Sequence, residues 1–406
     1  MSDPWRPLEG IRVTDFFWLI AGPATSRVLA DYGAEVIKIE TAARPDQIRQ
    51  TGIWPPGASG ASANAVFADC NTNKQSITLN LSDSRGIELA KELVRNSDIV
   101  TNNFTGERMD RWGLGYDDLV QVKPDIIMLT MPVMGTTGPY RSYGAFGGGV
   151  IAYGGLNTNM GFPGREPVGM GPRYSDFSTP YAAVSALMAA LHHRDRTGEG
   201  QFIDIAQAQA TVGLLGTGVI EHSATGEVPP PPGNRARDYC PHGAYRCAGD
   251  DRWLAIAVRG DDDWRGLCAA VDAPDLATDP RFATHDARKA NEDALDALIE
   301  GWTSQREAWA AMHELQAAGV IASVVSNVED LITRDPHMRE RHFEDVEDIS
   351  GEFVHTIHRQ PSRIDGQTPP LKRPPTLGEH NEAVFKGLLG VSDDDYVELL
   401  AGEVIN

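Results

Sequence analysis

The sequence predicts an α/β protein with a large, doubly wound, Rossmann-like domain and a smaller α+β domain. Three observations predict this fold class. Short apolar runs alternate with helix-spaced segments over the first 130 or so residues, which is typical of a parallel sheet covered by helices. The 406 residues are too many for one ordinary core. A proline run at 229–232 marks a break, beyond which a hairpin pattern is followed by helical patterns.

The first third of the chain reads as repeated strand and helix units. An apolar strand at 10–19 is followed by a helix-spaced segment that stops at Gly33, and a second apolar strand follows at 34–40. The pattern then continues with strands at 75–81, 98–104 and 125–132, and with helices at 84–96 and 116–124. In such sheets, ligands bind beyond the carboxyl ends of the strands.

The next segments complete the larger domain. The glycine-rich stretch 134–155 predicts a loop of functional backbone, because it follows a strand end. An apolar helix is expected from about Ser178 to Arg194, with Ser178 as its N-cap and Pro180 in its first turn. A turn into a strand follows at 196–207.

Beyond the proline run, the pattern predicts the smaller domain and a return of the chain. A hairpin is expected at 242–260 and helices over 292–319, where apolar residues recur at helical spacing. Strand character resumes at 353–361, and two short helices close the sequence.

Composition limits the partners and the compartment. The net charge of −21 opposes binding to nucleic acid, and apolar runs such as 182–191 are too short to span a bilayer. The four cysteines lack zinc spacing, and no secretory leader pattern is present, so we expect a reduced, cytoplasmic protein without a metal site or a membrane partner.

Several catalytic signatures are missing. The segment 19–29, between the first strand and helix, has one glycine where a dinucleotide fingerprint needs three, which disfavours NAD chemistry. Phosphate-loop, zinc-protease and serine-hydrolase motifs are also absent. The remaining candidate is Asp176 in "GPRYSDFSTPYAA" (171–183). It can be read as a helix cap or as an ionised nucleophile near a helix N-terminus.

Four stretches carry a resemblance to a known family: "PLEGIRVTDF…AGPATSRVLADYGAEVIKIE" (7–40), "NTNKQSITLNL" (71–81), "NNFTGERMDRWGLGY" (102–116) and "PRYSDFSTPYAAVSALMAALHHRDRTGEGQFIDI" (172–205). In this order, and with "LGEHNEAVFKGLLG" (377–390), the sequence resembles the class III CoA-transferases, the formyl-CoA, carnitine and bile-acid group. The form of the nucleophile motif resembles the benzylsuccinate CoA-transferase branch.

The resemblance implies a chemistry for Asp176. This carboxylate would attack an acyl-CoA thioester, carry the acyl group as a mixed anhydride, and then carry CoA as an aspartyl thioester. The CoA thioester would be a substrate, with no tightly bound cofactor, and a carboxylic acid would be the acceptor. The residues that match CoA-binding positions, with further arginine candidates, are Asn73, Lys74, Asn103, Phe104, Arg111, Arg44, Arg108 and Arg141. Each arginine can equally be a solvated surface residue.

Two departures from the family bear on the substrate. Ile20 stands where formyl-CoA transferases have a glutamine, and their later glycine run is replaced by 231–245. A hydrophobic or aromatic acyl group is therefore expected, although Ile20 can also be a core residue. His242 and Tyr245 are candidates for the substrate pocket, or are structural.

The resemblance also implies an interlocked homodimer and a division of the chain. Residues 1–200 would form the large CoA-binding domain, completed by 330–406. Residues 201–225 would be a linker, 226–325 the small domain, and 326–406 a second linker with the return to the large domain. Two rival functions stay open. An acyl-CoA racemase of the same fold needs a second acid or base, and 131–191 contains no histidine. A non-catalytic acyl-CoA-binding protein would leave Asp176 without a role.

Overall fold

The computed structural model describes residues 6–58, 63–171, 173–228 and 230–406. The chain divides into two compact units. One takes in the chain up to Leu156 together with Gly169–Ile220 and His337–Asn406, and the other consists of Asn157–Val168 and Glu221–Pro336. The second unit thus extends beyond the expected 226–325 at both ends, and it includes a short segment from before the nucleophile motif.

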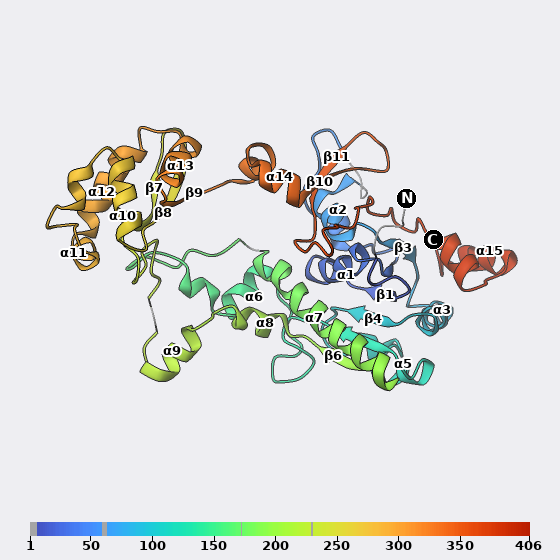
Figure 1. The fold of residues 1–406 in the computed structure, drawn as a ribbon. Helices are drawn as coiled ribbons and strands as arrows, with labels where there is room; N and C mark the ends of the chain where they lie inside the picture. The colour runs from blue at the N-terminus through green and yellow to red at the C-terminus, as the bar shows by residue number, and fades with distance from the viewer. Residues whose placement is uncertain (1–5, 59–62, 172, 229) are drawn as a thin grey trace. The chain divides into compact units, whose positions relative to one another are not determined.

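A six-stranded, wholly parallel sheet forms the centre of the first unit (Figure 1). Its strands are β1 (Arg12–Phe16), β2 (Glu35–Glu40), β3 (Gln75–Thr78), β4 (Ile99–Asn102), β5 (Ile127–Thr130) and β6 (Phe202–Asp204). The order is β3-β2-β1-β4-β5-β6, and every neighbouring pair is parallel. This confirms the predicted α/β class. The strand order reverses beside β1, and in sheets of this kind the carboxyl ends of the strands at such a reversal, here β1 and β4, are where ligands bind.

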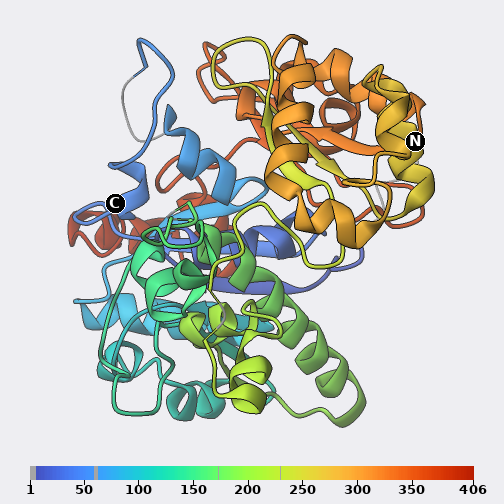
Figure 2. The same cartoon turned by 90° about the vertical axis from the view of Figure 1, so that its left-hand side faces the viewer.

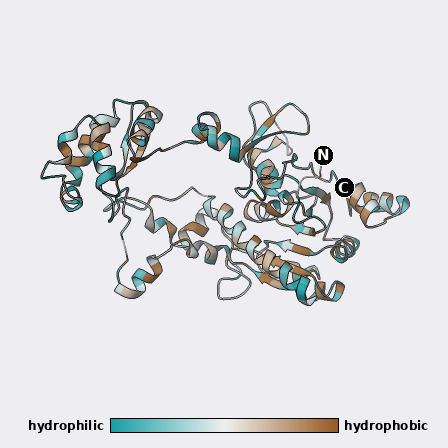
Figure 3. Ribbon diagram, in the orientation of Figure 1, coloured by the Kyte–Doolittle hydropathy of each residue, from teal (hydrophilic) through white to brown (hydrophobic). Residues whose placement is uncertain are grey.

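The sheet is covered on both faces because its side chains alternate. On one face Val36, Ile99 and Leu129 pack with residues of α1 and α7, and on the other Ile37, Val100 and Met128 pack with residues of α3, α5 and the end of the chain. Figure 3 shows hydrophobic residues on the strands and on parts of the covering helices. This two-sided burial explains why the strands read as continuous apolar runs.

The helices of the first unit follow the predicted alternation. They are α1 (Ala21–Asp31), η1 (Gln47–Arg49), α2 (Ala65–Asn71), α3 (Ser84–Arg95), α4 (Arg108–Arg111), α5 (Tyr116–Val122), α6 (Gly147–Tyr153), α7 (Tyr174–Thr197) and α8 (Gln207–Gly213). Helices η3 (Leu156–Asn159) and α9 (Gly218–Thr225) each include residues of both units. Helices α1 and α7 pack against each other, and α7 is the long green helix of Figure 2.

The last part of the chain returns to the first unit. It contains α14 (Pro336–His342), the antiparallel pair β10 (Phe343–Glu347) and β11 (Val354–His358), the π-helix η6 (Ala383–Leu388) and α15 (Asp393–Ala401). Side chains of η6, α15 and the final residues enter the same core as β2 and β3. The sheet therefore depends on residues from both ends of the chain.

Helix α7 differs from its prediction at both ends. It begins at Tyr174 and ends at Thr197, so Ser178 and Pro180 lie inside it. Ser178 is not the N-cap, and Asp176 lies within the first turn instead of before it. Because proline has no N–H, Pro180 cannot donate the usual helical hydrogen bond to the Asp176 carbonyl.

The glycine-rich stretch also differs from its prediction as a loop. Residues Gly147–Tyr153 form α6, in which Val150 and Ile151 are buried, and α6 packs against α7 and α8. Burial of these two side chains outweighs the low helix propensity of the glycines.

The second unit is built on an antiparallel sheet. Strands β7 (His242–Arg246), β8 (Trp253–Ala257) and β9 (Ile321–Val324) are ordered β7-β8-β9, which confirms the hairpin expected at 242–260. The helical segments are α10 (Asp261–Ala270), η4 (Pro274–Ala277), α11 (His285–Ala290), α12 (Glu292–Thr303), α13 (Ala308–Ala317) and the π-helix η5 (Asp330–Arg334). The unit has its own apolar core.

The four cysteines, Cys70, Cys240, Cys247 and Cys268, are all buried and free of disulfides. Within the described ranges, no helix is long and apolar enough to cross a bilayer. The same residues contain no group of three or more histidine, cysteine or acidic side chains that could hold a metal ion.

Candidate active site

The turn between β1 and α1 forms one side of the crevice. We call residues 17–20, which connect the two elements, the β1–α1 loop. Gly22 allows the start of α1 to lie close to this loop, since a Cβ there would be only 2.4 Å from the Phe17 ring. Leu19 has a φ of 69°, a left-handed conformation that is uncommon for a residue other than glycine. The loop is therefore held in a conformation that its own sequence does not favour.

The loop after β4 meets the β1–α1 loop. Asn103 accepts a hydrogen bond from the Trp18 N–H at 3.1 Å, and its Nδ2 donates to the Trp18 carbonyl at 2.8 Å. The Asn103 amide thus pairs with both backbone groups of Trp18, as the backbone of a neighbouring strand would. Asn103 is in the predicted region, but its side chain is engaged with the backbone, so any contact with CoA falls to its main chain or its neighbours.

Aromatic rings and arginines extend this edge. The Phe104 ring lies edge-on to Trp18 and Trp112, with centroids 6.0 and 5.6 Å apart. The Arg108 guanidinium is 5.7 Å from the Phe104 centroid, and Arg111 lies exposed at the end of α4. These groups offer flat apolar surface beside positive charge, which suits a nucleotide with phosphates.

Two further predicted arginines lie on segments that leave the carboxyl ends of strands. Arg44 follows β2 and Arg141 follows β5, and both are exposed. Because β2, β1, β4 and β5 are consecutive in the sheet, these segments emerge from the same edge as α4. These arginines are the candidates for meeting an anionic ligand in a chain whose own net charge is strongly negative.

Asp176 lies in the first turn of α7 and is half-buried. Burial raises the pKa of this carboxyl to about 6, and the positive charge of Arg173 opposes the rise. The preceding Ser175 is fully buried and donates to the Gly147 carbonyl at 3.4 Å, which connects this turn to α6. A partly desolvated carboxylate is a stronger nucleophile and base than a solvated one.

Ile20 is at the start of α1 and contacts an apolar cluster of Ile48, Val66 and Phe67. It is only partly buried, so one side of it remains open at the carboxyl edge of β1. The placement is compatible with both roles that the sequence left open, as core residue and as pocket wall.

Asn73 and Lys74 lie elsewhere than the prediction requires. They precede β3, at the amino end of the sheet. The Lys74 ammonium is buried and donates to the Pro23 carbonyl at 2.8 Å and to Asn71 Oδ1 at 3.0 Å, with Asp15 3.5 Å away. All three donors are thus used within the protein. Burial lowers the pKa of Lys74 to about 8. The Lys74 ammonium is therefore engaged inside the protein, where it holds the first turn of α1, and its assignment to a CoA phosphate stays a prediction.

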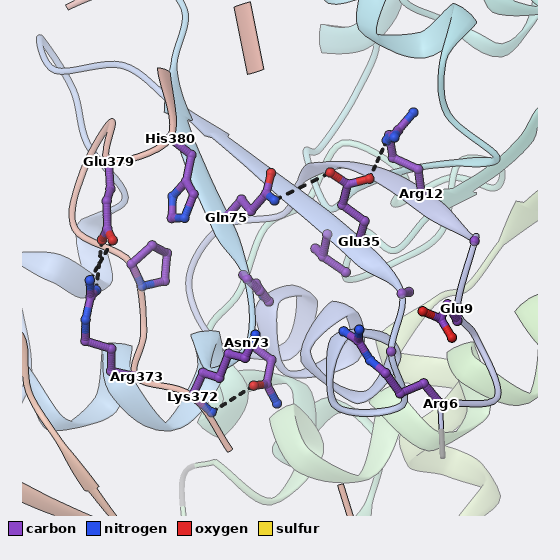
Figure 4. A pocket seen from close by; sticks show the side chains of 16 residues that line it. Arg6, Glu9, Arg12, Glu35, Asn73, Gln75, Lys372, Arg373, Glu379 and His380 are labelled. Atoms are coloured by element: carbon purple, nitrogen blue, oxygen red, sulfur yellow. Dashed lines mark hydrogen bonds and ion pairs between the residues drawn. The ribbon is translucent and has the colours of Figure 1, made fainter. Parts of the chain in front are cut away.

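The Asn73 side chain is likewise engaged, since its Nδ2 donates to Asp31 at 2.7 Å and its Oδ1 accepts from the Lys372 N–H at 2.8 Å. Both residues line a cavity of about 540 Å³ at the amino edge of the sheet, shown in Figure 4. Its walls carry two internal ion pairs, Arg12 with Glu35 and Arg373 with Glu379. The cavity is on the edge opposite to the crevice.

The two pocket candidates of the second unit differ from each other. Tyr245 is 2% exposed in the core of that unit, and its hydroxyl donates to Asp296 at 2.8 Å. The hydroxyl, the one polar atom of this side chain, is thus engaged within the second unit, and the role in the substrate pocket stays a prediction. His242 is half-exposed, its Nδ1 lies 2.7 Å from the Asn234 carbonyl, and its ring stacks on Tyr239.

Sequence reasoning missed Lys38 and Asp46. Lys38 is inside a strand that was read only as apolar, yet its ammonium forms a fully buried ion pair with Asp46 at 2.8 Å. A lysine within a buried strand requires a buried acceptor, and this signal was available in "VIKIE" (36–40).

The fold and these groups together define a class: an α/β protein with aromatic rings and arginines at the carboxyl edge of its sheet and a partly desolvated carboxylate in the first turn of α7. Comparison with known proteins identifies the family. The model of CoA-transferase family III matches residues 8–381. The chain therefore belongs to that family, and the protein is a transferase enzyme.

Relatives of known function are similar over the whole chain. The sequence is 34% identical to a succinyl-CoA–D-citramalate CoA-transferase of Chloroflexus aurantiacus, with 99% of both chains covered. It is 30% identical to a formyl-CoA:oxalate CoA-transferase of Streptomyces coelicolor, covering 98% of this chain and 99% of the relative. A CAIB/BAIF family protein from Brucella suis has a similar structure, with a TM-score of 0.86 at 32% identity over 94% of this chain and 99% of the other.

Proposed function

We propose that the protein transfers CoA from an acyl-CoA thioester to a free carboxylic acid, with Asp176 as the covalent carrier. The observation that carries this proposal is the half-buried Asp176 carboxylate, with its raised pKa, in the first turn of α7. The family membership supplies the reaction class, and the crevice supplies the arginines and rings for CoA.

The proposed reaction is a series of balanced acyl transfers. The Asp176 carboxylate attacks the thioester carbonyl, a mixed anhydride forms, and CoA leaves as its thiolate. The thiolate attacks the aspartyl carbonyl, which releases the donor acid and gives an aspartyl CoA thioester. The acceptor carboxylate then displaces the thiolate to give a new anhydride. Attack of the thiolate on the acceptor's carbonyl yields the new acyl-CoA and restores Asp176. No redox step or metal is needed.

In this proposal the CoA is held at the carboxyl edge by Phe104, Arg108, Arg111, Arg44 and Arg141. Phe104 and Arg108 provide a surface for a flat ring, and the other arginines provide charge for phosphates. The backbone around Asn103 completes this surface. The side chains of Asn73, Lys74 and Tyr245 have no part in it.

The acyl group is proposed to be hydrophobic or aromatic, because Ile20 replaces a polar group at the start of α1 and belongs to an apolar cluster. A second candidate is a short dicarboxylic acyl group. The names of two relatives favour it, because they specify succinyl-CoA as a substrate together with D-citramalate or L-malate.

A donor panel separates these candidates. Succinyl-CoA, formyl-CoA and a phenyl-substituted acyl-CoA are each incubated with a set of free acids, and the CoA products are separated by chromatography. Fastest transfer from the phenyl donor supports the apolar pocket, and fastest transfer from succinyl-CoA supports the dicarboxylic alternative. Fastest transfer from formyl-CoA to oxalate contradicts the importance given to Ile20.

Mass spectrometry tests the covalent step. An acyl or CoA adduct on the peptide that contains Asp176 is expected after incubation with a donor and quenching. Hydroxylamine should remove this adduct. A protein that binds the donor but forms no adduct would instead fit a binding protein, and α-deuterium exchange in a 2-methylacyl-CoA would fit a racemase.

We also propose that the protein is a homodimer. Helix α9 has no buried residue within the single chain, and its Val219 and Ile220 side chains are exposed. Apolar residues gathered on one uncovered helix are typical of a surface that meets another chain. Sedimentation at micromolar concentration should give twice the 44.0 kDa mass of the chain, and a stable monomer contradicts the proposal.

A further inference from the structure

Residues 17–19 of the β1–α1 loop form backbone hydrogen bonds with side chains and not with the backbone of a neighbouring strand. The Lys38 ammonium donates to the Phe17 carbonyl at 2.6 Å. The Asn103 amide forms both of its hydrogen bonds with Trp18, as described above. These contacts come from β2 and from the loop after β4, the two strands that flank β1. Each neighbour of β1 therefore contributes one side chain to the same short loop.

Asp46 completes this arrangement at the strained residue. Its Oδ1 accepts from the Leu19 N–H at 3.0 Å and from the Ile48 N–H at 3.1 Å, and its Oδ2 accepts from Lys38 at 2.8 Å. Asp46 and Lys38 are both fully buried. The carboxylate thus ties the left-handed Leu19 to β2 and to the segment that starts η1.

The carboxylates around Lys38 favour its charged form. Burial acts to lower the pKa of Lys38, but the carboxylates of Asp46, Glu40 and Asp15 outweigh it and hold the pKa above its usual value. Two further cations belong to the cluster: Arg49 pairs with Glu40 at 2.7 Å, and Lys74 lies 3.5 Å from Asp15. The Lys38 ammonium therefore donates both to the Phe17 carbonyl and to Asp46.

We propose that Lys38 and Asp46 are positioning residues for CoA transfer. Through Phe17 and Leu19 they fix the loop so that Trp18 and Ile20 form a defined wall of the acyl-CoA crevice. The proposal rests on the function proposed above. A left-handed leucine relaxes unless its surroundings hold it, and relaxation would turn its two neighbours in new directions. Small displacements of groups that position substrate cost about 100-fold in rate.

The experiment compares Asp46→Asn with a matched control, Asp330→Asn. The asparagine at 46 keeps an oxygen for Leu19 but presents an amide N–H₂ to the Lys38 ammonium, which the pair cannot accommodate. The control makes the same substitution at a buried aspartate of the second unit, which pairs with Arg252 at 2.8 Å. Both variants lose stability, so thermal unfolding provides the correction for the folded fraction.

Per folded molecule, kcat/KM of Asp46→Asn should fall about 100-fold for the preferred donor, whereas Asp330→Asn should stay within about threefold of the wild type. The ratio of kcat/KM between two donors that differ only in the acyl group should also move toward one in Asp46→Asn alone. A purely structural role would not change this ratio. Equal activity and equal selectivity in the two variants overturn the proposal.

A double variant, Lys38→Met with Asp46→Asn, serves if the single variant does not fold. It removes the unpaired charge but also removes the donor to Phe17, so it should be folded and still have reduced selectivity. Wild-type selectivity in this variant overturns the proposal. A wild-type protein that transfers CoA from none of the donors would instead overturn the proposed function, and the two failures are thereby distinguished.

Discussion

The ring of Phe177 lies edge-on to the ring of His358, with their centroids 6.0 Å apart. Phe177 follows the candidate nucleophile, whereas His358 ends β11, near the other end of the chain. His358 is itself held by Asp69, whose Oδ1 is 2.8 Å from its Nδ1, and it lies beside the buried Arg27 of α1. The first turn of α7 therefore rests on a histidine anchored to α1 and α2.

Replacing Asp176 with Asn should abolish CoA transfer, by at least about 1000-fold, because the amide cannot attack a thioester. The fold should be kept, since Arg173, and not Asp176, is the N-cap residue of α7. Activity and circular dichroism check both expectations. Asp195→Asn, an exposed change in the same helix, is the matched control. Wild-type turnover in folded Asp176→Asn protein would exclude the carrier role.

Activity should rise with pH through about 6. The reactive form of Asp176 is the carboxylate, and burial raises its pKa to about 6. A profile of kcat/KM from pH 4.5 to 8 measures the rising limb. Arg173 opposes the shift, so Arg173→Met should move this limb to higher pH. An unchanged limb in Arg173→Met contradicts the electrostatic assignment.

The Asp176 carboxyl should also make the free energy of unfolding fall as pH rises. Its pKa is higher in the folded state than the usual value of 3.8, so the folded protein binds the proton more tightly. Stability is therefore lost as pH rises from about 4 to about 6. Asp176→Asn removes this effect. The difference in unfolding temperature, variant minus wild type, should thus be larger at pH 7 than at pH 4.

Leu19→Gly should be tolerated and Leu19→Val should not. Glycine adopts a φ of 69° without strain, whereas a β-branched side chain in this conformation costs about 2 kcal/mol. Denaturant unfolding compares the two variants with wild type. Glycine also removes the apolar contacts of the leucine side chain, so Leu19→Gly should change the free energy of unfolding by no more than about 1 kcal/mol. Equal destabilisation by both residues would indicate that side-chain packing, and not backbone conformation, dominates at this position.

His358→Phe should destabilise the first unit by about 2 kcal/mol. The phenyl ring preserves the edge-on contact with Phe177 but removes the hydrogen bond to the charged Asp69. Denaturant unfolding measures the loss. His192→Phe, a change at an exposed position of α7, provides the comparison. If His358→Phe is as stable as the wild type, the contact with Asp69 contributes nothing net.

The sequence was most informative where one physical requirement dominated. The strand at 34–40 and the hairpin at 242–260 follow from local apolar patterns, and the structure has both. The start of α7 was misplaced because Ser178 and Pro180 match the usual pattern of a helix start, whereas packing of α6 and Ser175 extends the helix by a turn. Local signals cannot report such tertiary contacts.

The candidate site likewise contains residues that local patterns indicate and residues whose surroundings depend on tertiary contacts. Asp176 is predicted from the residues around it and from the family resemblance, and its role stays a prediction. The surroundings of Lys74 could not be predicted, because a lysine in a turn looks solvated until the fold brings Pro23 and Asn71 to its ammonium. The partner of Tyr245 could not be predicted for a similar reason, since Asp296 is 51 positions away in the sequence.

The burial of all four cysteines has a chemical consequence for an enzyme that handles activated acyl groups. A protein thiolate near the crevice would compete with the CoA thiolate for an anhydride and trap the acyl group as a dead-end thioester. Burial raises the pKa of Cys70 to about 12, and those of Cys240 and Cys268 to about 11. At neutral pH these sulfur atoms are protonated and shielded from electrophiles. The native chain therefore offers no sulfur nucleophile of its own, and alkylation by iodoacetamide should begin only as the protein unfolds.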